Sequence, residues 1–362
     1  MPLQARRTRS ANVEFGFRTD DFGVTRAFRR GMVLARFKSG PACEAVLVPV
    51  GMEVSSVANL GRDADVEFAE LDVVLTRQFD PNDPGLSKQW HHTKIQSANA
   101  WALSLATHKV TLAILDSPFQ MNHPDLVANT VAGWDMLTGL PISGVTEGLY
   151  HSTIVAGLAG AAIDNGVGVS GAANGWLMPI NIGDNPTTSD MHDAVVWAAD
   201  HGVRVVNLSW DGAFSTVIND AGAYLKAKTG GMLFMAGVNV LNGRKFLNYP
   251  NQPDIYAISM TDRNDQPRST YGEHIDFAAP GWEIYSTTTN STYEVDSGTS
   301  YSSPLVAGIT AWVMSVNPAL GPAEIEGILR ESAVDLGAPG WDQVFGWGRI
   351  DFGRVAREQS VE

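Results

Sequence analysis

Hydrophobic positions in the first part of the chain follow short patterns. Between residues 54 and 64 they have the spacing of a short helix. Three segments alternate apolar and polar side chains, as half-buried strands do: 31–40, 44–51 and 66–79. A polar, proline-containing stretch with the composition of a linker follows at residues 80–89. We therefore expect a small α+β region in residues 1–79 and a separate domain in residues 80–362.

Beyond this stretch the apolar runs alternate between strand and helix patterns. Strand-like runs occupy 109–116, 177–183, 203–210, 231–239, 254–261 and 274–281. Helical patterns occupy 153–163, 190–202 and 221–230, and another begins at Ser300. Near-continuous apolar strands are typical of a parallel sheet covered on both faces. Because strands and helices alternate, the larger domain is predicted to be α/β with a doubly wound, mostly parallel sheet.

Composition narrows the possible partners and locations. The formal net charge of −14 argues against nucleic acid or an anionic membrane as a partner, because both would repel the chain. No apolar run reaches the roughly 18 residues of a membrane span. The single cysteine, Cys43, excludes an internal disulfide and a cysteine-built zinc site. The N-terminal arginines precede no apolar segment, so the sequence as written has no signal peptide, which favours the cytoplasm unless a leader is missing.

Three chemically useful side chains stand where a strand ends or a helix starts. Asp116 ends the strand 109–116, and His151 and Ser300 each open a helix rich in small residues. In α/β folds such positions gather at the carboxyl ends of the strands. A serine hydroxyl attacks an acyl group only with help from a base, and a buried carboxylate holds an imidazole ready for that task. Together they indicate acyl transfer, although Ser300 alone reads equally well as a helix cap.

The motifs around these residues resemble those of the subtilisin-like serine proteases, the subtilases. The resemblance covers residues 80–355 and includes the chain order Asp, His, Ser and the stretches AILDSPFQMNHPDL, HSTIVAGLAG and SGTSYSSPLVAG. It is closest to thermitase-type members of the family. It implies a subtilisin-like fold and a serine endopeptidase in which Ser300 is the nucleophile, His151 the general base and Asp116 its orienting partner.

A second histidine competes for the role of base. His123 follows Asp116 by only seven residues, and its position in the family is a structural turn, so we favour His151. The remaining histidines, His91 and His92 among them, stand in polar or amphipathic contexts and are predicted to lie at the surface.

The family builds its oxyanion hole from the backbone N–H of the nucleophile and an asparagine side chain. In the stretch MAGVN, one alignment gives this role to Asn239, with Val238 where the family has glycine. The other alignment puts Val238 itself at the asparagine position. We favour Asn239 as the donor.

The substrate cleft departs from the family pattern. The edge segment that reads Ser-Leu-Gly-Gly in the family consists here of Ser209, Trp210, Asp211 and Gly212. The segment 184–190 is shorter than in thermitase-type members. With Val238, these changes predict a narrowed cleft that takes a restricted range of peptide or protein substrates, or mainly the chain's own pro-segment. Two rival readings remain: a non-catalytic binding scaffold on the same fold, and an esterase or acyl transferase that uses the same triad.

The resemblance also implies a structural calcium ion. Thermitase-type members hold Ca²⁺ with two remote aspartates and a loop after the histidine helix. The matching ligands in this sequence are Asp83, Asp125, the side chain of Asn165 and the carbonyls of Ile163, Val167 and Val169. Carboxylates combined with neutral oxygens suit this hard cation. The alternative is that the aspartates merely cap turns.

Residues 1–79 resemble a shortened form of the family's inhibitor-like pro-domain. One helix and one strand of the family's unit are missing, and a strand within residues 10–30 is a possible substitute. The expectation is a self-processing zymogen whose pro-segment inhibits the same chain and is cleaved within residues 75–80. The alternative is an N-terminal extension that is never removed. The family resemblance further implies a secreted protein, and we expect a monomer.

Overall fold

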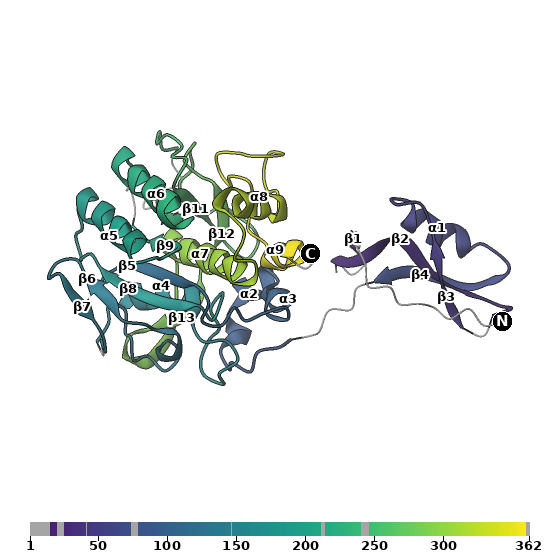
Figure 1. The fold of residues 1–362 in the computed structure, drawn as a ribbon, viewed down its shortest axis with the longest axis horizontal. Coiled ribbons are helices and arrows are strands. Elements are labelled where there is room, and N and C mark those ends of the chain that lie inside the picture. Colours follow the sequence, from purple (N-terminus) through teal and green to yellow (C-terminus); the bar gives the residue numbers. More distant parts are fainter. Residues whose placement is uncertain are drawn as a thin grey trace. The chain divides into compact units, whose positions relative to one another are not determined.

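A computed structural model of the chain describes residues 15–19, 25–40, 42–73, 79–145, 147–210, 214–239 and 246–359. The chain divides into two compact units, one within residues 1–77 and a larger one of residues 78–359 (Figure 1). None of the described helices is long and apolar enough to cross a membrane.

The N-terminal unit is a small antiparallel sheet with one helix. Its elements are β1 (Phe15–Thr19), β2 (Thr25–Phe37), β3 (Cys43–Leu47), α1 (Glu53–Leu60) and β4 (Val66–Val73). The long strand β2 pairs with β1, β3 and β4. The α+β prediction is confirmed, and β1 is the strand that was anticipated within residues 10–30. The last part of the predicted strand 66–79, residues 74–78, lies outside the described residues.

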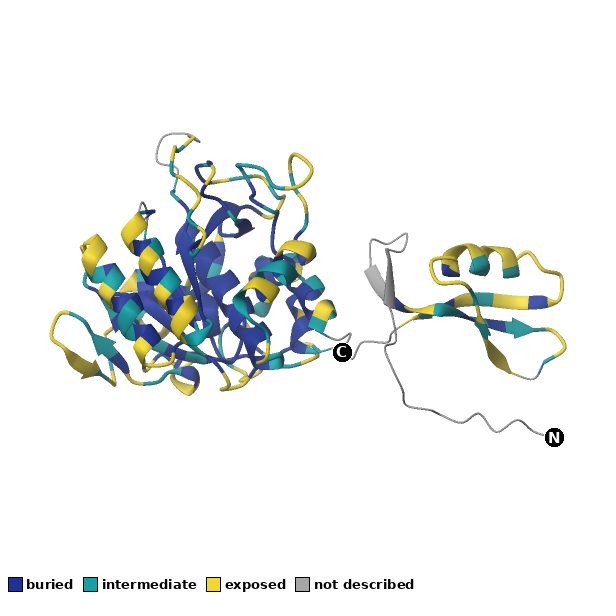
Figure 2. Cartoon of the chain, turned by 45° about the horizontal axis from the view of Figure 1, so that its top comes forward, coloured by how far each residue is buried: buried dark blue, intermediate teal, exposed yellow. Residues whose placement is uncertain are grey.

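This unit has a very small core. The buried apolar side chains of its described residues group around Phe28, Val33 and Leu71. Several large apolar side chains remain at its surface, including Leu47 at 79% exposure and Phe68 at 40% (Figure 2). Such a limited core provides little stabilisation by burial, because small units bury a low fraction of their surface.

The larger unit is built on an eight-stranded sheet in the order β12-β11-β10-β9-β5-β8-β6-β7. Its strands are β5 (Thr111–Asp116), β6 (Gly133–Asp135), β7 (Leu140–Ile142), β8 (Trp176–Asn181), β9 (Val205–Leu208), β10 (Met232–Ala236), β11 (Tyr256–Thr261) and β12 (Phe277–Pro280). All neighbouring pairs are parallel except β6 with β7. A separate antiparallel hairpin joins β13 (Ile284–Thr288) and β14 (Thr292–Asp296).

Helices cover both faces of this sheet, so the predicted doubly wound α/β fold is confirmed (Figure 1). The helices are α2 (Trp90–Lys94), α3 (Ser97–Trp101), α4 (Tyr150–Gly160), α5 (Thr188–Asp200), α6 (Thr216–Thr229), α7 (Thr299–Val316), α8 (Pro322–Ser332) and α9 (Phe352–Gln359). Helices α4 and α7 pack together on one face, and α5 and α6 on the other. Small residues permit the close approach of α4 and α7: a Cβ at Gly308 of α7 would lie 2.5 Å from the Ala159 carbonyl oxygen of α4.

The alternation of side chains along β5 directs the last residue of this strand. Leu112 and Ile114 belong to the core on the α4 and α7 face, whereas Ala113 and Leu115 belong to the core under α5 and α6. Because successive side chains of a strand point to opposite faces, Asp116 points to the face that α4 and α7 cover. The sheet therefore directs this carboxylate toward the two helices that carry His151 and Ser300.

Residues 80–89 have the composition of a linker, but the structure places them in the larger unit and buries several of their side chains. Asp83 is only 4% exposed and Gln89 only 1%. The Gln89 side chain donates to the Ser170 carbonyl and accepts from the Ser170 N–H, both at 2.8 Å. The glycine of this stretch permits close packing, since a Cβ at Gly85 would lie 2.4 Å from the Gly168 carbonyl oxygen. This stretch therefore packs within the larger unit although its composition is that of a linker.

The prediction that His91 and His92 lie at the surface is wrong. They are 0% and 3% exposed, because α2 packs against α3 and places His92 against the Trp101 ring at 4.7 Å between centroids. Burial lowers the pKa of His92 to about 4. The ring is held by contacts with the Ser97 hydroxyl at 2.8 Å and the Ser170 carbonyl at 2.9 Å. Burial also lowers the pKa of His91 well below its usual value, so both histidines are neutral core residues near pH 7.

Candidate active site

Asp116 and His151 form the central contact of the site. The carboxylate Oδ2 of Asp116 lies 2.8 Å from Nδ1 of His151. The other oxygen, Oδ1, accepts from the Ser117 N–H at 2.8 Å and from the Ser117 hydroxyl at 3.2 Å. Asp116 is 2% exposed, whereas the His151 side chain is 39% exposed. A buried carboxylate thus holds Nδ1 of an imidazole that is partly accessible to solvent.

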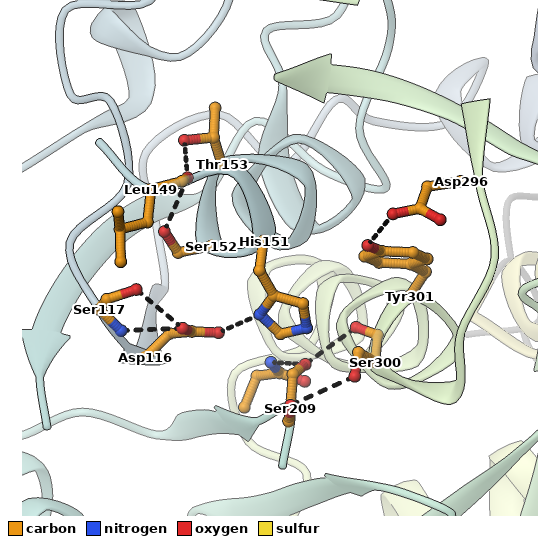
Figure 3. Close-up of polar contacts among 11 residues, drawn as sticks. Asp116, Ser117, Leu149, His151, Ser152, Thr153, Ser209, Asp296, Ser300 and Tyr301 are labelled. Atoms are coloured by element: carbon orange, nitrogen blue, oxygen red, sulfur yellow. Dashed lines mark hydrogen bonds and ion pairs between the residues drawn. The ribbon is translucent and has the colours of Figure 1, made fainter. Parts of the chain in front are cut away.

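Ser300 lies in the first turn of α7, beside this imidazole. Figure 3 shows the His151 ring between the Asp116 carboxylate and the start of α7. The N-cap of α7 is Gly298, and the Ser300 hydroxyl donates to the Ser209 carbonyl oxygen at 3.2 Å. The helix-cap reading of Ser300 is therefore wrong, because its hydroxyl does not bond to an N–H of the helix.

The three residues open into one cavity of about 380 Å³. Its lining consists of Asp116, Ser117, Leu149, His151, Asp184, Ser209, Trp210, Asn239 and Ser300. A cavity with a serine, a histidine and a buried carboxylate on its wall can accommodate an acyl group beside the serine. This is the arrangement on which nucleophilic acyl transfer depends.

Asn239 lies on the same wall, with its amide oriented by the neighbouring backbone. Its Oδ1 accepts from the Thr299 N–H at 2.9 Å, whereas the Thr299 hydroxyl donates its one proton to the closer Gly237 carbonyl oxygen at 2.5 Å. An N–H can only donate, so the amide oxygen must face Thr299 and the amide NH₂ faces the other way. Asn239 itself lines the cavity with Ser300. Val238 packs instead against the core under α5 and α6, and its carbonyl accepts from the Thr270 N–H at 3.0 Å.

Of the expected cleft residues, Ser209 and Trp210 line the cavity. Asp211 and Gly212 lie outside the described residues. The side chain of Trp210 packs partly against the core under α5 and α6.

The structure also places residues here that the sequence analysis missed. Tyr301 is 4% exposed, its ring centroid lies 5.9 Å from that of His151, and its hydroxyl donates to Asp296 at 2.7 Å (Figure 3). Burial, together with the hydrogen bond and negative charge of Asp296, raises the pKa of Tyr301 above its usual range. The Tyr301 hydroxyl is therefore protonated at neutral pH. In the sequence, only the position of Tyr301 directly after Ser300 could have indicated that it lies at this site.

The two aspartates expected to bind calcium meet at the loop that follows α4. Asp83 accepts from the N–H groups of Asp164 and Asn165 at 2.9 and 3.0 Å, and from the Ser170 hydroxyl at 2.6 Å. Asp125 accepts from the Asn165 amide at 2.9 Å and from the Val169 N–H at 2.7 Å. Of the other expected ligands, Ile163 is buried and accepts at its carbonyl from Asn174 at 3.3 Å, and Val167 donates its N–H to the Asn165 amide oxygen at 2.7 Å.

The chemistry of this cluster suits a cation. Burial raises the pKa of Asp125 to about 6, and the negative charge of Asp83 acts in the same direction. A cation between the two carboxylates would relieve this repulsion. In the described part of the chain, no three His, Cys, Asp or Glu side chains converge on one point.

The competing histidine, His123, is held by backbone groups of its own region. Its Nδ1 accepts from the Asp125 N–H at 3.1 Å, and its Nε2 lies 3.2 Å from the Thr292 carbonyl oxygen. Both ring nitrogens of His123 therefore contact backbone groups, one of them at Asp125.

Comparison with known proteins gives one consistent family. The subtilase (peptidase S8) family matches residues 107–348. Thermitase of Thermoactinomyces vulgaris is 35% identical over 249 residues, which are 66% of this chain and 86% of thermitase. Halolysin of Haloferax mediterranei is 32% identical over 298 residues, which are 79% of this chain and 56% of halolysin. The chain thus spans about half the length of some relatives and most of the length of others.

Solved structures agree on the fold. A protease of Pseudoalteromonas arctica PAMC 21717 matches with a TM-score of 0.65 and 25% identity, covering 77% of this chain and 99% of its own. A lanthipeptide protease matches with a TM-score of 0.65 at 21% identity and covers 76% of this chain and 95% of its own, which supports the fold alone. With the matched family model spanning the sheet and all three site residues, the chain belongs to the subtilase family.

Proposed function

We propose that this chain is a serine endopeptidase that hydrolyses peptide bonds with Ser300, His151 and Asp116. The observation that carries the proposal is the 2.8 Å contact between Asp116 and His151 on the wall of a cavity that Ser300 shares. Membership of the subtilase family supports the same activity. Peptide or protein substrates follow from the family, and the changed cleft residues favour a restricted range of them.

The proposed reaction has two halves. The Ser300 hydroxyl turns from the Ser209 carbonyl, gives its proton to Nε2 of His151, and its oxygen attacks the scissile carbonyl carbon. The C–N bond then breaks, and the leaving amine takes that proton from His151, which leaves an acyl group on Ser300. Water attacks this ester in the same way, with His151 as base, and releases the acid and the free serine. Asp116 holds Nδ1–H throughout and stabilises the imidazolium.

The backbone N–H of Ser300 and the amide NH₂ of Asn239 form the proposed oxyanion hole. The support for Asn239 is its place and orientation: it lines the cavity with Ser300, and its Oδ1 faces Thr299, so the NH₂ group lies on the other side of the amide. Donors that are already in place stabilise the negative oxygen of the tetrahedral intermediate without reorganisation.

Replacing Asn239 tests this assignment. We expect Asn239→Ala to lower kcat by about 10²–10³-fold with little change in KM, because the donor acts mainly in the transition state. Steady-state kinetics with a chromogenic peptide measures this. Asn239→Asp keeps an oxygen for the Thr299 N–H but removes the donor, so an equal or larger loss is expected. If Asn239→Asp retains full kcat, Asn239 is not the donor and the alternative alignment gains support.

One experiment distinguishes the proposed protease from an esterase and from a non-catalytic scaffold. Wild-type protein is incubated with a fluorophosphonate probe, with unfolded protein substrates and with simple esters, and labelling is located by mass spectrometry. Labelling at Ser300 with peptide cleavage supports the protease. Labelling with ester turnover but no cleavage of any peptide supports an esterase. Folded protein that never labels supports the non-catalytic scaffold.

We further propose that residues 1–79 act as a pro-segment that inhibits residues 80–362 within the same chain and is then cut off within residues 75–80. The limited core of the N-terminal unit supports this, since such a unit is expected to be marginally stable alone and to depend on a partner. Relatives described as extracellular proteases, from Natrialba magadii and Bacillus subtilis, support a secreted enzyme.

A structural Ca²⁺ held near Asp83 and Asp125 is also proposed. The carboxylates of both residues, the amide oxygen of Asn165 after rotation of its side chain, and the carbonyls of Ile163, Val167 and Val169 would hold it. The support is that Asp83 and Asp125 are buried carboxylates that both contact the loop after α4, and that the negative charge of Asp83 helps to raise the pKa of Asp125. Bound there, the ion would join the segment near residue 83 to the loop after α4.

Removing calcium is expected to destabilise the larger unit. A ligand that binds only the folded state at 100 times its Kd contributes about 2.7 kcal/mol. We therefore expect a chelator to lower the melting temperature of the wild-type chain, measured by differential scanning fluorimetry. Asp125→Asn should remove this calcium dependence, whereas Asp220→Asn, a charge removal at a side chain that is 81% exposed, should leave it intact. A melting temperature that is independent of calcium in wild type would refute the site.

A further inference from the structure

Ser209 and Ser300 are joined by two hydrogen bonds that run in opposite directions. The Ser300 hydroxyl donates to the Ser209 carbonyl at 3.2 Å, and the Ser209 hydroxyl donates to the Ser300 carbonyl at 2.9 Å (Figure 3). Both residues are buried: Ser300 is 7% exposed and Ser209 is 3% exposed. These two hydrogen bonds join the residue that follows β9 to the first turn of α7, at the proposed nucleophile Ser300.

The Ser300 carbonyl needs such a partner because of Pro304. In an α-helix the carbonyl of residue 300 would accept from the N–H of residue 304. Pro304 lies inside α7 and has no N–H to donate. A buried carbonyl left without a donor costs free energy. The Ser209 hydroxyl supplies, from another segment, the donor that the helix cannot.

Two further buried groups support the Ser209 hydroxyl. The Asn207 amide donates to Oγ of Ser209 at 2.9 Å, and the Ser303 hydroxyl donates to the Asn207 amide oxygen at 2.7 Å. Asn207 and Ser303 are both 0% exposed. A hydroxyl has only one proton to donate. Since Ser209 Oγ accepts from the Asn207 amide, its own proton is directed to the Ser300 carbonyl.

We propose that Ser209 is a positioning residue for the nucleophile, acting through its side-chain hydroxyl. By holding the Ser300 carbonyl in place of the missing N–H of Pro304, it sets the backbone of Ser300 and thus the direction in which Oγ leaves the helix. Misplacement of a reacting group by about 1 Å can cost 10²-fold in rate. This role is separate from contact with substrate at the cleft edge, and it rests on the proposed function of Ser300.

Substitutions at Ser209 and Pro304 test the role as a pair. We expect Ser209→Ala to lower kcat and the rate of fluorophosphonate labelling by about 10–100-fold, with KM changed less than about twofold. Pro304→Ala introduces a backbone N–H at the position that a helix uses, so the Ser300 carbonyl regains a donor. In the Pro304→Ala background the same Ser209→Ala change should therefore cost less than about threefold. Ser209→Thr keeps the hydroxyl and should retain most of the activity.

A matched control lies two residues further along, in the same first turn of α7. Ser302 is 0% exposed, and its hydroxyl donates to the Ala279 carbonyl at 3.1 Å, away from Ser300. Ser302→Ala should lower the melting temperature about as much as Ser209→Ala while leaving kcat and labelling near wild type.

The outcomes separate the two proposals. Wild-type protein that does not label at Ser300 refutes the proposed enzyme. Wild-type protein that labels, together with Ser209→Ala that labels at the same rate, refutes only the positioning role. A loss that is equally large in the Pro304→Ala background also refutes it, because Ser209 would then act by something other than supplying the missing donor.

Discussion

Ser300→Ala should abolish labelling by a fluorophosphonate and lower peptide hydrolysis on the order of 10⁶-fold. Without the hydroxyl there is no nucleophile, and only the oxyanion donors and substrate binding remain to assist attack by water. The same change should keep the chain at its full length during storage, if wild type removes its own residues 1–79. Labelling, steady-state kinetics and intact mass measure the three effects on one preparation.

Stability separates this expectation from loss of folding. The Ser300 hydroxyl makes one hydrogen bond, to the Ser209 carbonyl, and the N-cap of α7 is Gly298. Its removal should therefore change the melting temperature little, since a single neutral hydrogen bond contributes about 1 kcal/mol. Ser302→Ala, with its buried hydroxyl in the same turn, is the matched control and should keep its activity. Unreduced hydrolysis by a folded Ser300→Ala chain would contradict the proposed nucleophile.

Asp116→Asn should lower kcat by about 10⁴-fold while the chain still folds. The carboxylate accepts the Nδ1–H of His151, and this tautomer has a lone pair on Nε2 that can take the proton of the serine. An asparagine amide can donate to Nδ1 instead, which puts the proton on Nε2 and removes the base. Substrate binding does not depend on this contact, so KM should change little. Initial rates at several pH values, with protein whose folding is verified by circular dichroism, measure the loss.

The control for this change is another aspartate at a strand end of the same sheet. Asp135 ends β6, and its Oδ2 accepts from the Asn181 amide at 3.0 Å. Hydrogen bonds from Asn181 and from the Thr138 and Leu137 N–H groups outweigh burial and hold the pKa of Asp135 below its usual range. Asp135→Asn removes a comparable charge without touching His151, so it should retain most of the activity. Equal losses in both variants would mean that the effect of Asp116→Asn is general and not tied to the imidazole.

The sequence by itself determined the family, the α/β class and the candidate triad. A short, near-continuous apolar run is typical of a strand buried in a parallel sheet, so the run 109–116 indicated β5 without any knowledge of its neighbours. Asp116, His151 and Ser300 each stand next to a boundary of such an element, and boundaries of this kind meet at one edge of a parallel sheet. Their order along the chain could therefore be read before their contact was known.

The tertiary structure alone decided which groups touch across long separations. Composition made residues 80–89 look like a linker and His91 and His92 look exposed, because polarity of a segment does not reveal the partners that bury it. The exchange of hydrogen bonds between Ser209 and Ser300 links groups 91 residues apart. A local pattern reports the backbone geometry of one segment, whereas a hydrogen bond between segments depends on how the sheet brings them together.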